Sequence, residues 1–395
     1  MMKFEVSPIQ RDFYLECLMN KSANTKYSIN LIFSLSTLQS LSKTKIKDLV
    51  CRVVNKQPVL ISTPIVEESS IYLSVGEPFL PEEIEYELSI KSLEDLKKED
   101  LFHTPFDLLL DKRLFRIKII EDREGRFYIL FSVHHFIFDF YSGIAFSQQI
   151  VNEIEAQNNL VEEDIIREQM DTIDIFRKKG GLQSFIDKFQ TRFMGNIDDI
   201  STIKSVDLLS EEKHEYRNQL NLDLKTGNNY RSSVIIAAFA HKYLEMTNQN
   251  SILVGVPVPN RNRNNRKLVT SIVTTYPILV KAGDTLEDCR NSICCQLFDN
   301  LKMQFFDFNN YFYKVSKFDI MFTYYPSDFH VQCGNSCLRV NSLFTINSPA
   351  PIHIMLNDNN VLMTEIQTGC FGDPELYVRD SIQSILNNYS NGEGW

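Results

Sequence analysis

The alternation of apolar and polar residues is most informative around the middle of the N-terminal half. Residues 127–133 are almost continuously apolar and aromatic, which is typical of a buried strand. From residue 144 to residue 154 apolar side chains recur at helical spacing, and Ser142 is a suitable N-cap for that helix. The polar residues at this junction between strand and helix are His134, His135 and Asp139.

Other segments alternate between helix and strand patterns in the same way. Residues 7–19 have Ser7 as an N-cap, Pro8 at the first helical position and apolar residues at four-residue steps. Residues 230–246 have the pattern of an apolar helix, and residues 251–259 that of a buried strand. Helices that alternate with strands indicate an α/β protein.

A polar, charged stretch that closes with Gly180 and Gly181 is the best candidate for a domain boundary. It predicts an N-terminal lobe at residues 1–165, which carries the histidine pair. It also predicts a helical connector at residues 166–181 and a C-terminal lobe at residues 182–395.

Composition narrows the class of protein. The 395 residues are enough for two domains, and a hydrophobic content of 43% is ordinary. No apolar run approaches the roughly 18 residues that a membrane span needs, and the first residues lack the apolar core of a signal peptide. We therefore expect a cytoplasmic protein without a membrane partner. The eight cysteines lack C-x-x-C spacing, so neither a bound metal nor a disulfide scaffold is expected.

The charge of the chain argues against nucleic acid as its main partner. The net charge is -10, so no basic surface is implied. One local basic cluster could be a solvated loop or a contact for an acidic partner or a phosphate. Its members are Arg261, Arg263, Arg266 and Lys267.

The histidine pair is the first candidate for chemistry. Neighbouring residues on a strand point to opposite faces, so one of His134 and His135 should face a pocket and the other the packing behind it. A histidine with a pKa near neutral is a natural general base for an amine or alcohol nucleophile. Asp139 could orient the turn or pair with an arginine. The alternative is that both histidines are hydrogen-bonded core residues and Asp139 is a helix cap.

The string HHFIFDFYS at residues 134–142 resembles the HHxxxDG motif of nonribosomal peptide synthetase condensation domains. The same motif marks their relatives among the chloramphenicol-acetyltransferase-like acyltransferases. Weaker matches lie in the order that the family shows. They are Ser7, Gln10 and Tyr14 in the opening helix, Leu114, Phe115 and Arg116 at the start of a strand, and Gly255, Pro257 and Arg261 after the apolar helix.

Several family positions are altered in this chain. The motif's glycine is replaced by Phe140, whose bulk would narrow, reshape or block the site. Ile61 stands where the family has an arginine near the active site. In the family's Gly-x-Phe-Val-Asn-Thr segment, Thr270 and Thr274 replace the glycine and the asparagine, whereas Thr275 keeps the threonine.

The resemblance implies an α/β fold of the α+β sandwich type. Two chloramphenicol-acetyltransferase-like lobes would form a V-shaped pseudo-dimer with a central tunnel. The donor would enter from one face on the phosphopantetheine arm of an acyl- or peptidyl-carrier protein, and the acceptor from the other. No cofactor would be bound by the chain itself, and we expect a monomer.

The resemblance also implies roles for particular residues. His135 is expected to accept the proton of the nucleophile or to position it, and Asp139 to hold the loop through an arginine. His134 and Phe140 would lie behind or beside these two, and Arg261 is our candidate partner for Asp139, because Ile61 has removed another arginine. The residues expected to contact substrate are Ser142, Thr274, Thr275 and His353.

Together these features predict a free-standing condensation-type acyltransferase that forms an amide, with its carrier protein acting in trans. Heterocyclisation domains have aspartates in place of both histidines, which excludes that class here. Two alternatives stay open. One is a coenzyme A-dependent O- or N-acyltransferase of the same superfamily, acting on a small amine or alcohol. The other is a catalytically silent module that recruits a carrier protein.

Overall fold

The computed structural model describes residues 2–19, 27–35, 42–89, 91–155, 162–179, 182–193, 213–220, 227–312, 318–325, 329–333, 336–343 and 350–390. Its contacts divide the chain into two compact units. Unit 1 comprises Met1–Arg177, Pro259–Val273 and Asp328–Asn347, and unit 2 comprises Lys178–Val258, Thr274–Ser327 and Ser348–Trp395. The first division lies inside the expected connector at residues 166–181. Two segments of the C-terminal half nevertheless pack with unit 1, so the units are not contiguous in sequence.

Unit 1 is built on a six-stranded sheet with the order β12-β13-β2-β7-β6-β5. A smaller sheet has the order β1-β4-β3. The elements of this unit are β1 (Lys3–Glu5), α1 (Pro8–Met19), β2 (Ser28–Leu35), α2 (Lys43–Asn55), β3 (Ser62–Glu67), β4 (Ser70–Val75), η3 (Pro81–Glu83), β5 (Glu85–Leu88), α3 (Leu93–Leu96), α4 (Asp100–His103), β6 (Phe115–Glu121), β7 (Phe127–His134), α5 (Phe140–Ile154), α6 (Glu162–Lys179, as far as Arg177), β12 (Phe329–Cys333) and β13 (Ser336–Leu343).

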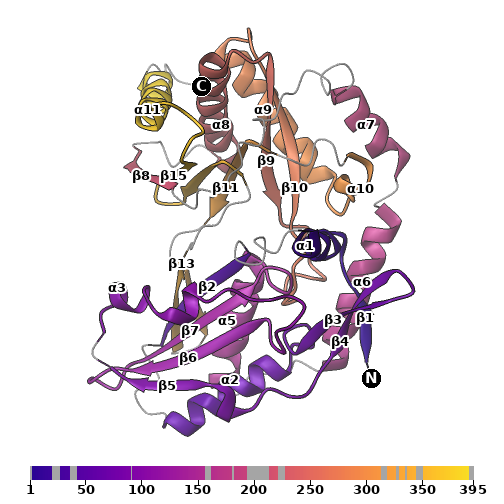
Figure 1. Ribbon diagram of the computed structural model, residues 1–395, viewed down its shortest axis with the longest axis vertical. Helices are drawn as coiled ribbons and strands as arrows, with labels where there is room; N and C mark the ends of the chain where they lie inside the picture. The colour runs from indigo at the N-terminus through magenta and orange to yellow at the C-terminus, as the bar shows by residue number, and fades with distance from the viewer. Residues whose placement is uncertain are drawn as a thin grey trace. The chain divides into compact units, whose positions relative to one another are not determined.

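The central strand β7 lies between β2 and β6, which are both antiparallel to it. Its phenylalanines alternate with residues on the opposite face, and Phe131 stacks on Phe146 of α5 with ring centroids 5.1 Å apart. Helices α2 and α5 contact each other and cover this face of the sheet (Figure 1). The aromatic run at residues 127–133 therefore forms the buried strand that the sequence predicts.

Strand β13 explains why a late segment belongs to unit 1. It pairs antiparallel with β2 over six residues, from Leu338 opposite Leu35 to Leu343 opposite Asn30. The hydrogen bonds of this ladder satisfy the free edge of β2. The sheet of unit 1 is thus completed by a strand about 300 residues away along the chain.

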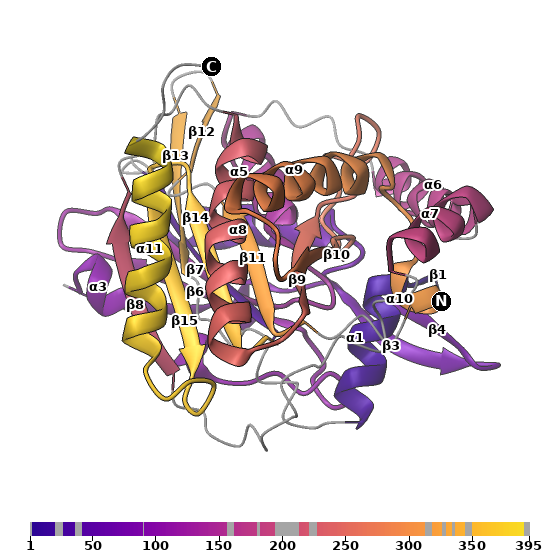
Figure 2. The same cartoon turned by 90° about the horizontal axis from the view of Figure 1, so that it is seen from above.

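Unit 2 has its own six-stranded sheet, with the order β10-β9-β11-β14-β15-β8. Helix α8 packs on this sheet between α9 and α11, all on one face (Figure 2). The elements of the unit are α7 (Gln183–Phe193), β8 (Lys213–Gln219), α8 (Asn228–Thr247), β9 (Ser251–Val258), β10 (Thr274–Lys281), α9 (Leu286–Lys302), α10 (Phe308–Phe312), β11 (Ile320–Tyr325), β14 (Ile352–Asn357), β15 (Val361–Gln367) and α11 (Pro374–Ser390).

The helix and strand predicted at residues 230–246 and 251–259 correspond to α8 and β9. The two units confirm the mixed α/β class and the division into two sheet-based lobes. Within the described ranges, no helix combines the length and the apolar character that crossing a bilayer requires.

Candidate active site

The turn after β7 sends the two histidines in different directions. The His134 backbone N–H donates to the carbonyl of Leu114 at 2.8 Å, and the His135 N–H donates to the carbonyl of Tyr27 at 2.6 Å. These bonds continue the β-ladder on alternate sides of the strand. The His134 side chain is completely buried, whereas that of His135 stays partly exposed. His135 is therefore the more accessible of the two side chains, and its contact with a substrate stays a prediction.

Helix α5 begins one turn earlier than the sequence suggests, and its N-cap is Asp139 rather than Ser142. The Asp139 carboxylate accepts from the Ser142 N–H at 2.8 Å, and the Asp139 N–H donates to the Ser142 hydroxyl. This reciprocal pair is a capping box, and it makes Ser142 the third helical residue. The negative charge of aspartate is also favourable at the N-terminus of a helix dipole.

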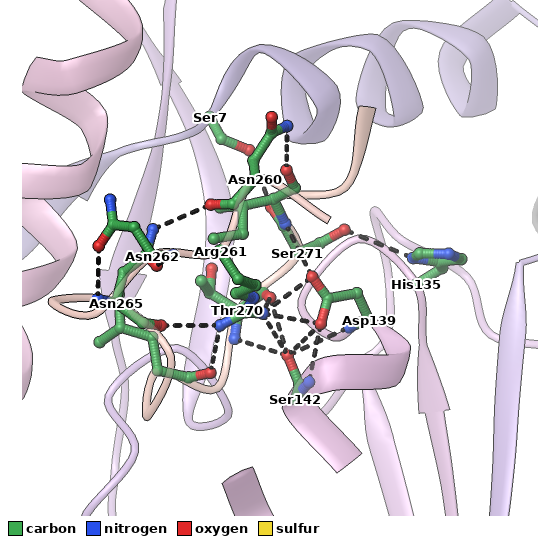
Figure 3. A network of polar contacts seen from close by, with 12 residues as sticks. Ser7, His135, Asp139, Ser142, Asn260, Arg261, Asn262, Asn265, Thr270 and Ser271 are labelled. Carbon is green, nitrogen blue, oxygen red and sulfur yellow. Dashed lines mark hydrogen bonds and ion pairs between the residues drawn. The ribbon is translucent and has the colours of Figure 1, made fainter. Parts of the chain in front are cut away.

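Asp139 is bound to Arg261, as the sequence analysis proposed (Figure 3). The Arg261 Nη2 group donates to Oδ1 of Asp139 at 2.7 Å and to Oδ2 at 2.8 Å. Oδ2 also accepts from the backbone N–H of Ile272 at 3.2 Å. Both side chains are almost fully buried, so this ion pair is desolvated and hydrogen-bonded at both oxygens.

The segment that carries Arg261 is folded around asparagine side chains. Asn260, at φ 50°, adopts a left-handed conformation that asparagine tolerates, and its Nδ2 donates to the carbonyl of Ile272 at 2.6 Å. Asn265 donates to the carbonyl of Asn260 at 3.0 Å. Arg261 itself donates to the carbonyls of Asn265, Leu268 and Thr270. The remaining members of the basic cluster, Arg263, Arg266 and Lys267, are exposed.

The His135 ring lies against an aromatic wall and near a serine. Its centroid is 5.0 Å from that of Phe13, and its Nδ1 is 3.4 Å from the Ser271 hydroxyl (Figure 3). Burial lowers the pKa of His135, while hydrogen bonds with backbone groups and the charge of Asp139 oppose the decrease. The imidazole is therefore neutral at physiological pH, which is the form that accepts a proton.

Helix α1 stabilises the turn that carries His135 through hydrogen bonds from Ser7 and Gln10. Ser7 and Gln10 form a capping box, in which the Ser7 N–H donates to Oε1 of Gln10 at 2.9 Å. The Gln10 Nε2 group then donates to the carbonyl of Phe136 at 2.9 Å, and the Ser7 hydroxyl donates to that of Ser271 at 2.9 Å. Ser7 and Gln10 thus hold the backbone of Phe136, next to His135, and of Ser271, whose hydroxyl lies near the His135 ring.

His134 supports the turn from within the core. Its Nδ1 accepts from the Phe136 N–H at 3.0 Å, so the proton of the neutral ring resides on Nε2. Burial lowers the pKa of His134 to about 3, and the neighbouring His135 adds to the decrease. Nε2 has no hydrogen-bond partner within the described residues. His134 is thus a neutral structural residue.

This assignment predicts an acid-labile contribution to stability. The unfolded chain binds a proton at His134 below a pH of about 6.5, whereas the folded protein resists it down to a pKa of about 3. The free energy of unfolding should therefore fall by about 1.4 kcal/mol per pH unit in this window. His134→Asn keeps an acceptor for the Phe136 N–H but cannot titrate, so the slope measured in urea titrations between pH 6 and 4 should become smaller by about this amount.

The control for this prediction is His103→Asn, because His103 lies exposed at the end of α4. Its pH dependence should match that of the wild type. An unchanged slope in folded His134→Asn would contradict the assignment of His134 as a buried neutral imidazole.

The other expected site residues are placed as follows. Phe140 is the first residue of α5 and half-buried, with its ring edge-on to Tyr141 at 6.0 Å. The Ser142 hydroxyl is buried and binds Asp139 and the carbonyl of Thr270. Thr274 and Thr275 lie on β10 and His353 on β14, all in unit 2. Contact of these residues with substrate stays a prediction.

The segment that ends at Ile61 has a packing role. Ile61, which stands where the family has an arginine, is buried in the apolar core of unit 1. Lys56 pairs with Glu153 of α5 at 3.0 Å, and Gln57 donates to Gln149 of the same helix at 2.6 Å. These residues hold α2 and the following turn against α5 rather than adding charge beside His135.

The arrangement differs from a Ser-His-Asp triad. In a triad the carboxylate bonds to the histidine ring and orients it. Here the Asp139 carboxylate bonds instead to Arg261, Ser142 and Ile272. No sequence pattern points to Ser271, although it lies in the segment that resembles a family motif. Its proximity to His135 follows only from the folding of residues 259–273.

Comparison with known proteins gives the fold a precedent. No family model matches the chain, and no curated protein matches it. Among solved structures, a mutant starter condensation domain of rhizomide synthetase RzmA in complex with C8-CoA matches with a TM-score of 0.76 at 14% identity, covering 98% of this chain and 95% of that one. The condensation domain from monacolin K polyketide synthase MokA matches with a TM-score of 0.76 at 9% identity, covering 99% and 98%.

These identities are low, but the matches extend over nearly the full length of both chains. They agree with the division of the fold into two lobes, each built on a six-stranded sheet. The chain therefore has the fold of the condensation domains found in nonribosomal peptide and polyketide synthases.

Proposed function

We propose that this chain is a condensation-type acyltransferase that moves an acyl or aminoacyl group from a carrier-protein phosphopantetheine thioester to an amine. The observation that carries the proposal is the neutral, partly exposed imidazole of His135 at the end of β7. A condensation-domain fold around this residue supports the same reaction class.

The reaction that follows from this site requires one general base. The amine nitrogen attacks the thioester carbonyl carbon, and His135 accepts the proton that the nitrogen loses. The tetrahedral intermediate then collapses, the carbon–sulfur bond breaks, and the thiolate takes the proton from the imidazolium. The products are an amide and a free thiol, and His135 returns to its neutral form.

Asp139 would act on this reaction indirectly. Its carboxylate binds Arg261 and caps α5, so it holds the backbone of the turn rather than the imidazole ring. Its charge still opposes the lowering of the pKa of His135. We infer that the Asp139–Arg261 pair is a positioning device that fixes the turn between β7 and α5.

The proposal predicts the acid side of the pH–rate profile. His135 must be neutral to accept a proton, and burial moves its pKa below the ordinary value of 6.5. With an aromatic amine as the acceptor, which stays unprotonated over this range, single-turnover rates should therefore stay constant as the pH falls to about 6.5 and decline only below it. An acid limb that lies above pH 6.5 would contradict the assignment of His135 as the base.

The identity of the donor is tested by intact-mass spectrometry of the wild-type protein. Purified protein would receive either acyl-loaded carrier protein or acyl-coenzyme A, together with a panel of amines and alcohols. Amide formation from the carrier thioester supports the proposal. Amide or ester formation from the coenzyme A thioester alone would favour the alternative acyltransferase, for which the C8-CoA held by one structural neighbour gives a precedent.

Phe140 gives a specific reason to keep the silent module as a second candidate. Its half-buried ring stands where the family motif has a glycine, next to the turn that carries His135. Carrier-protein binding without turnover for any donor would favour this candidate. In that case Phe140→Gly should restore amide formation, because the variant removes the ring and keeps the backbone N–H.

A further inference from the structure

The Ser271 hydroxyl lies beside the His135 ring, and hydrogen bonds hold the loop around it in place. Ser271 is fully buried, and its carbonyl accepts from the Ser7 hydroxyl at 2.9 Å. The flanking N–H groups of Thr270 and Ile272 donate to the capping box of α5, at 3.0 and 3.2 Å. The backbone of Ser271 is thus fixed on both sides, and its hydroxyl is preorganised next to His135.

The nitrogen that this hydroxyl approaches is Nδ1 of His135, at 3.4 Å (Figure 3). Burial lowers the pKa of His135, whereas hydrogen bonds of the ring with backbone groups of His135 and Phe138 raise it. A backbone group that raises the pKa of an imidazole accepts its proton, so it is a carbonyl oxygen. Only Nδ1 can reach the carbonyl of its own residue, because Nε2 lies on the far side of the ring. Nδ1 therefore carries the hydrogen of the neutral ring, and Nε2 is the proton acceptor.

We propose that Ser271 is a positioning residue, whose hydroxyl oxygen accepts from Nδ1–H of His135 and stabilises the imidazolium that forms when Nε2 takes a proton. At 3.4 Å the bond to the neutral ring is long. A positive charge on the donor shortens and strengthens such a bond, so the contact favours the protonated ring. The hydrogen bond itself is independent of the proposed function, and only its effect on acyl transfer rests on that function.

The effect on the reaction depends on when the contact is strong. Nε2 of His135 accepts the proton of the attacking amine, Nδ1 keeps its own hydrogen, and no proton passes to Ser271. The contact is therefore weak while substrate binds and strengthens as charge develops on the ring. An interaction of this kind raises the rate of the chemical step and leaves substrate affinity nearly unchanged. The charge of Asp139 favours the same protonated ring, but its carboxylate bonds to Arg261 instead.

Nuclear magnetic resonance tests the hydrogen bond without any substrate. In protein labelled with ¹⁵N-histidine, the ring signals of His135 are identified by their absence from His135→Ala. The wild type should have its neutral ring protonated on Nδ1. In Ser271→Ala the pKa of His135 should be lower than in the wild type, because the protonated ring loses an acceptor. Ser271→Thr keeps the hydroxyl and should retain most of the wild-type pKa.

Single-turnover kinetics test the effect on acyl transfer. Ser271→Ala should lower the rate at saturating amine by roughly tenfold, with the half-saturating amine concentration nearly unchanged, and Ser271→Thr should restore most of the rate. Ser132→Ala is the matched control for both measurements. Ser132 is as buried as Ser271 and lies on β7 of the same unit, and its hydroxyl has no hydrogen-bond partner among the described residues. This control should match the wild type in rate and in the pKa of His135.

Any of three results would overturn the inference: a neutral wild-type ring protonated on Nε2, or a pKa of His135 or a transfer rate in folded Ser271→Ala equal to that in Ser132→Ala. If Ser271→Ala does not fold, Ser271→Cys, whose sulfur is only a weak acceptor, takes its place in both measurements. Absence of acyl transfer in the wild type, together with a lowered pKa of His135 in Ser271→Ala, would remove the proposed function and leave the hydrogen bond standing.

Discussion

Arg261→Met is expected to destabilise unit 1 by about 3–5 kcal/mol and to remove activity with it. The substitution leaves the Asp139 carboxylate buried at 2% exposure without its only ion-pair partner among the described residues. It also deletes the donors that hold the carbonyls of Leu268 and Thr270. Urea denaturation, followed by far-ultraviolet circular dichroism, would measure the loss of stability.

Two variants separate the ion pair from general effects of substitution. Arg263→Met lies two residues away in the same loop but is exposed, so its unfolding free energy should change by less than about 0.5 kcal/mol. In the double variant Asp139→Asn/Arg261→Met the buried charge is gone, and part of the lost stability should return. An Arg261→Met protein as stable as Arg263→Met would show that the pair does not hold the turn.

His135→Ala is expected to lower the rate of acyl transfer by about 100- to 10,000-fold. The variant removes the base but leaves the backbone bond from residue 135 to Tyr27 and the Asp139–Arg261 pair in place. Its stability should therefore stay close to that of the wild type. Carrier-protein affinity should also persist, because the imidazole acts on the nucleophile rather than on docking.

His103→Ala is the matched control for this substitution. His103 is exposed and belongs to the same unit, so its rate should equal that of the wild type. A rate in folded His135→Ala within a few-fold of the control would mean that substrate positioning, without a base, accounts for the reaction.

The order of the helices and strands could be predicted because its signals are local. Apolar periodicity and helix caps lie within a few residues of the elements that they specify, as in the strand at residues 127–133 and the capped helix α1. The cap of α5 was misplaced for an equally local reason. Asp139 and Ser142 are both good N-cap residues, and only the reciprocal bond between them shows which begins the helix.

Other features depend on contacts between distant segments. Strand β13 pairs with β2 in the sheet of unit 1, but no pattern in the sequence of β13 indicates that β2 is its partner. Ser271 reaches His135 only because Asn260 and Asn265 fold the intervening loop. Glu365 is a charged residue on an alternating strand, where sequence would send it to solvent, so its burial could not be predicted.

The Asp139–Arg261 pair is a long-range contact that could nevertheless be predicted. Neither residue predicts the other by spacing, since 122 positions separate them. The match of Gly255, Pro257 and Arg261 to a family pattern supplied the missing long-range information. The structure adds that Asp139 caps α5 in addition to binding Arg261 of the loop.

The central claim is that His135 is the base for acyl transfer, and single-turnover product formation tests it most directly. Wild type, His135→Ala and His103→Ala would each be mixed with acyl-loaded carrier protein and an amine acceptor, and the carrier would be followed by intact mass. The account predicts loss of the acyl mass and appearance of amide with wild type and His103→Ala, and an unchanged acyl-carrier mass with His135→Ala. Equal conversion by all three proteins would contradict it.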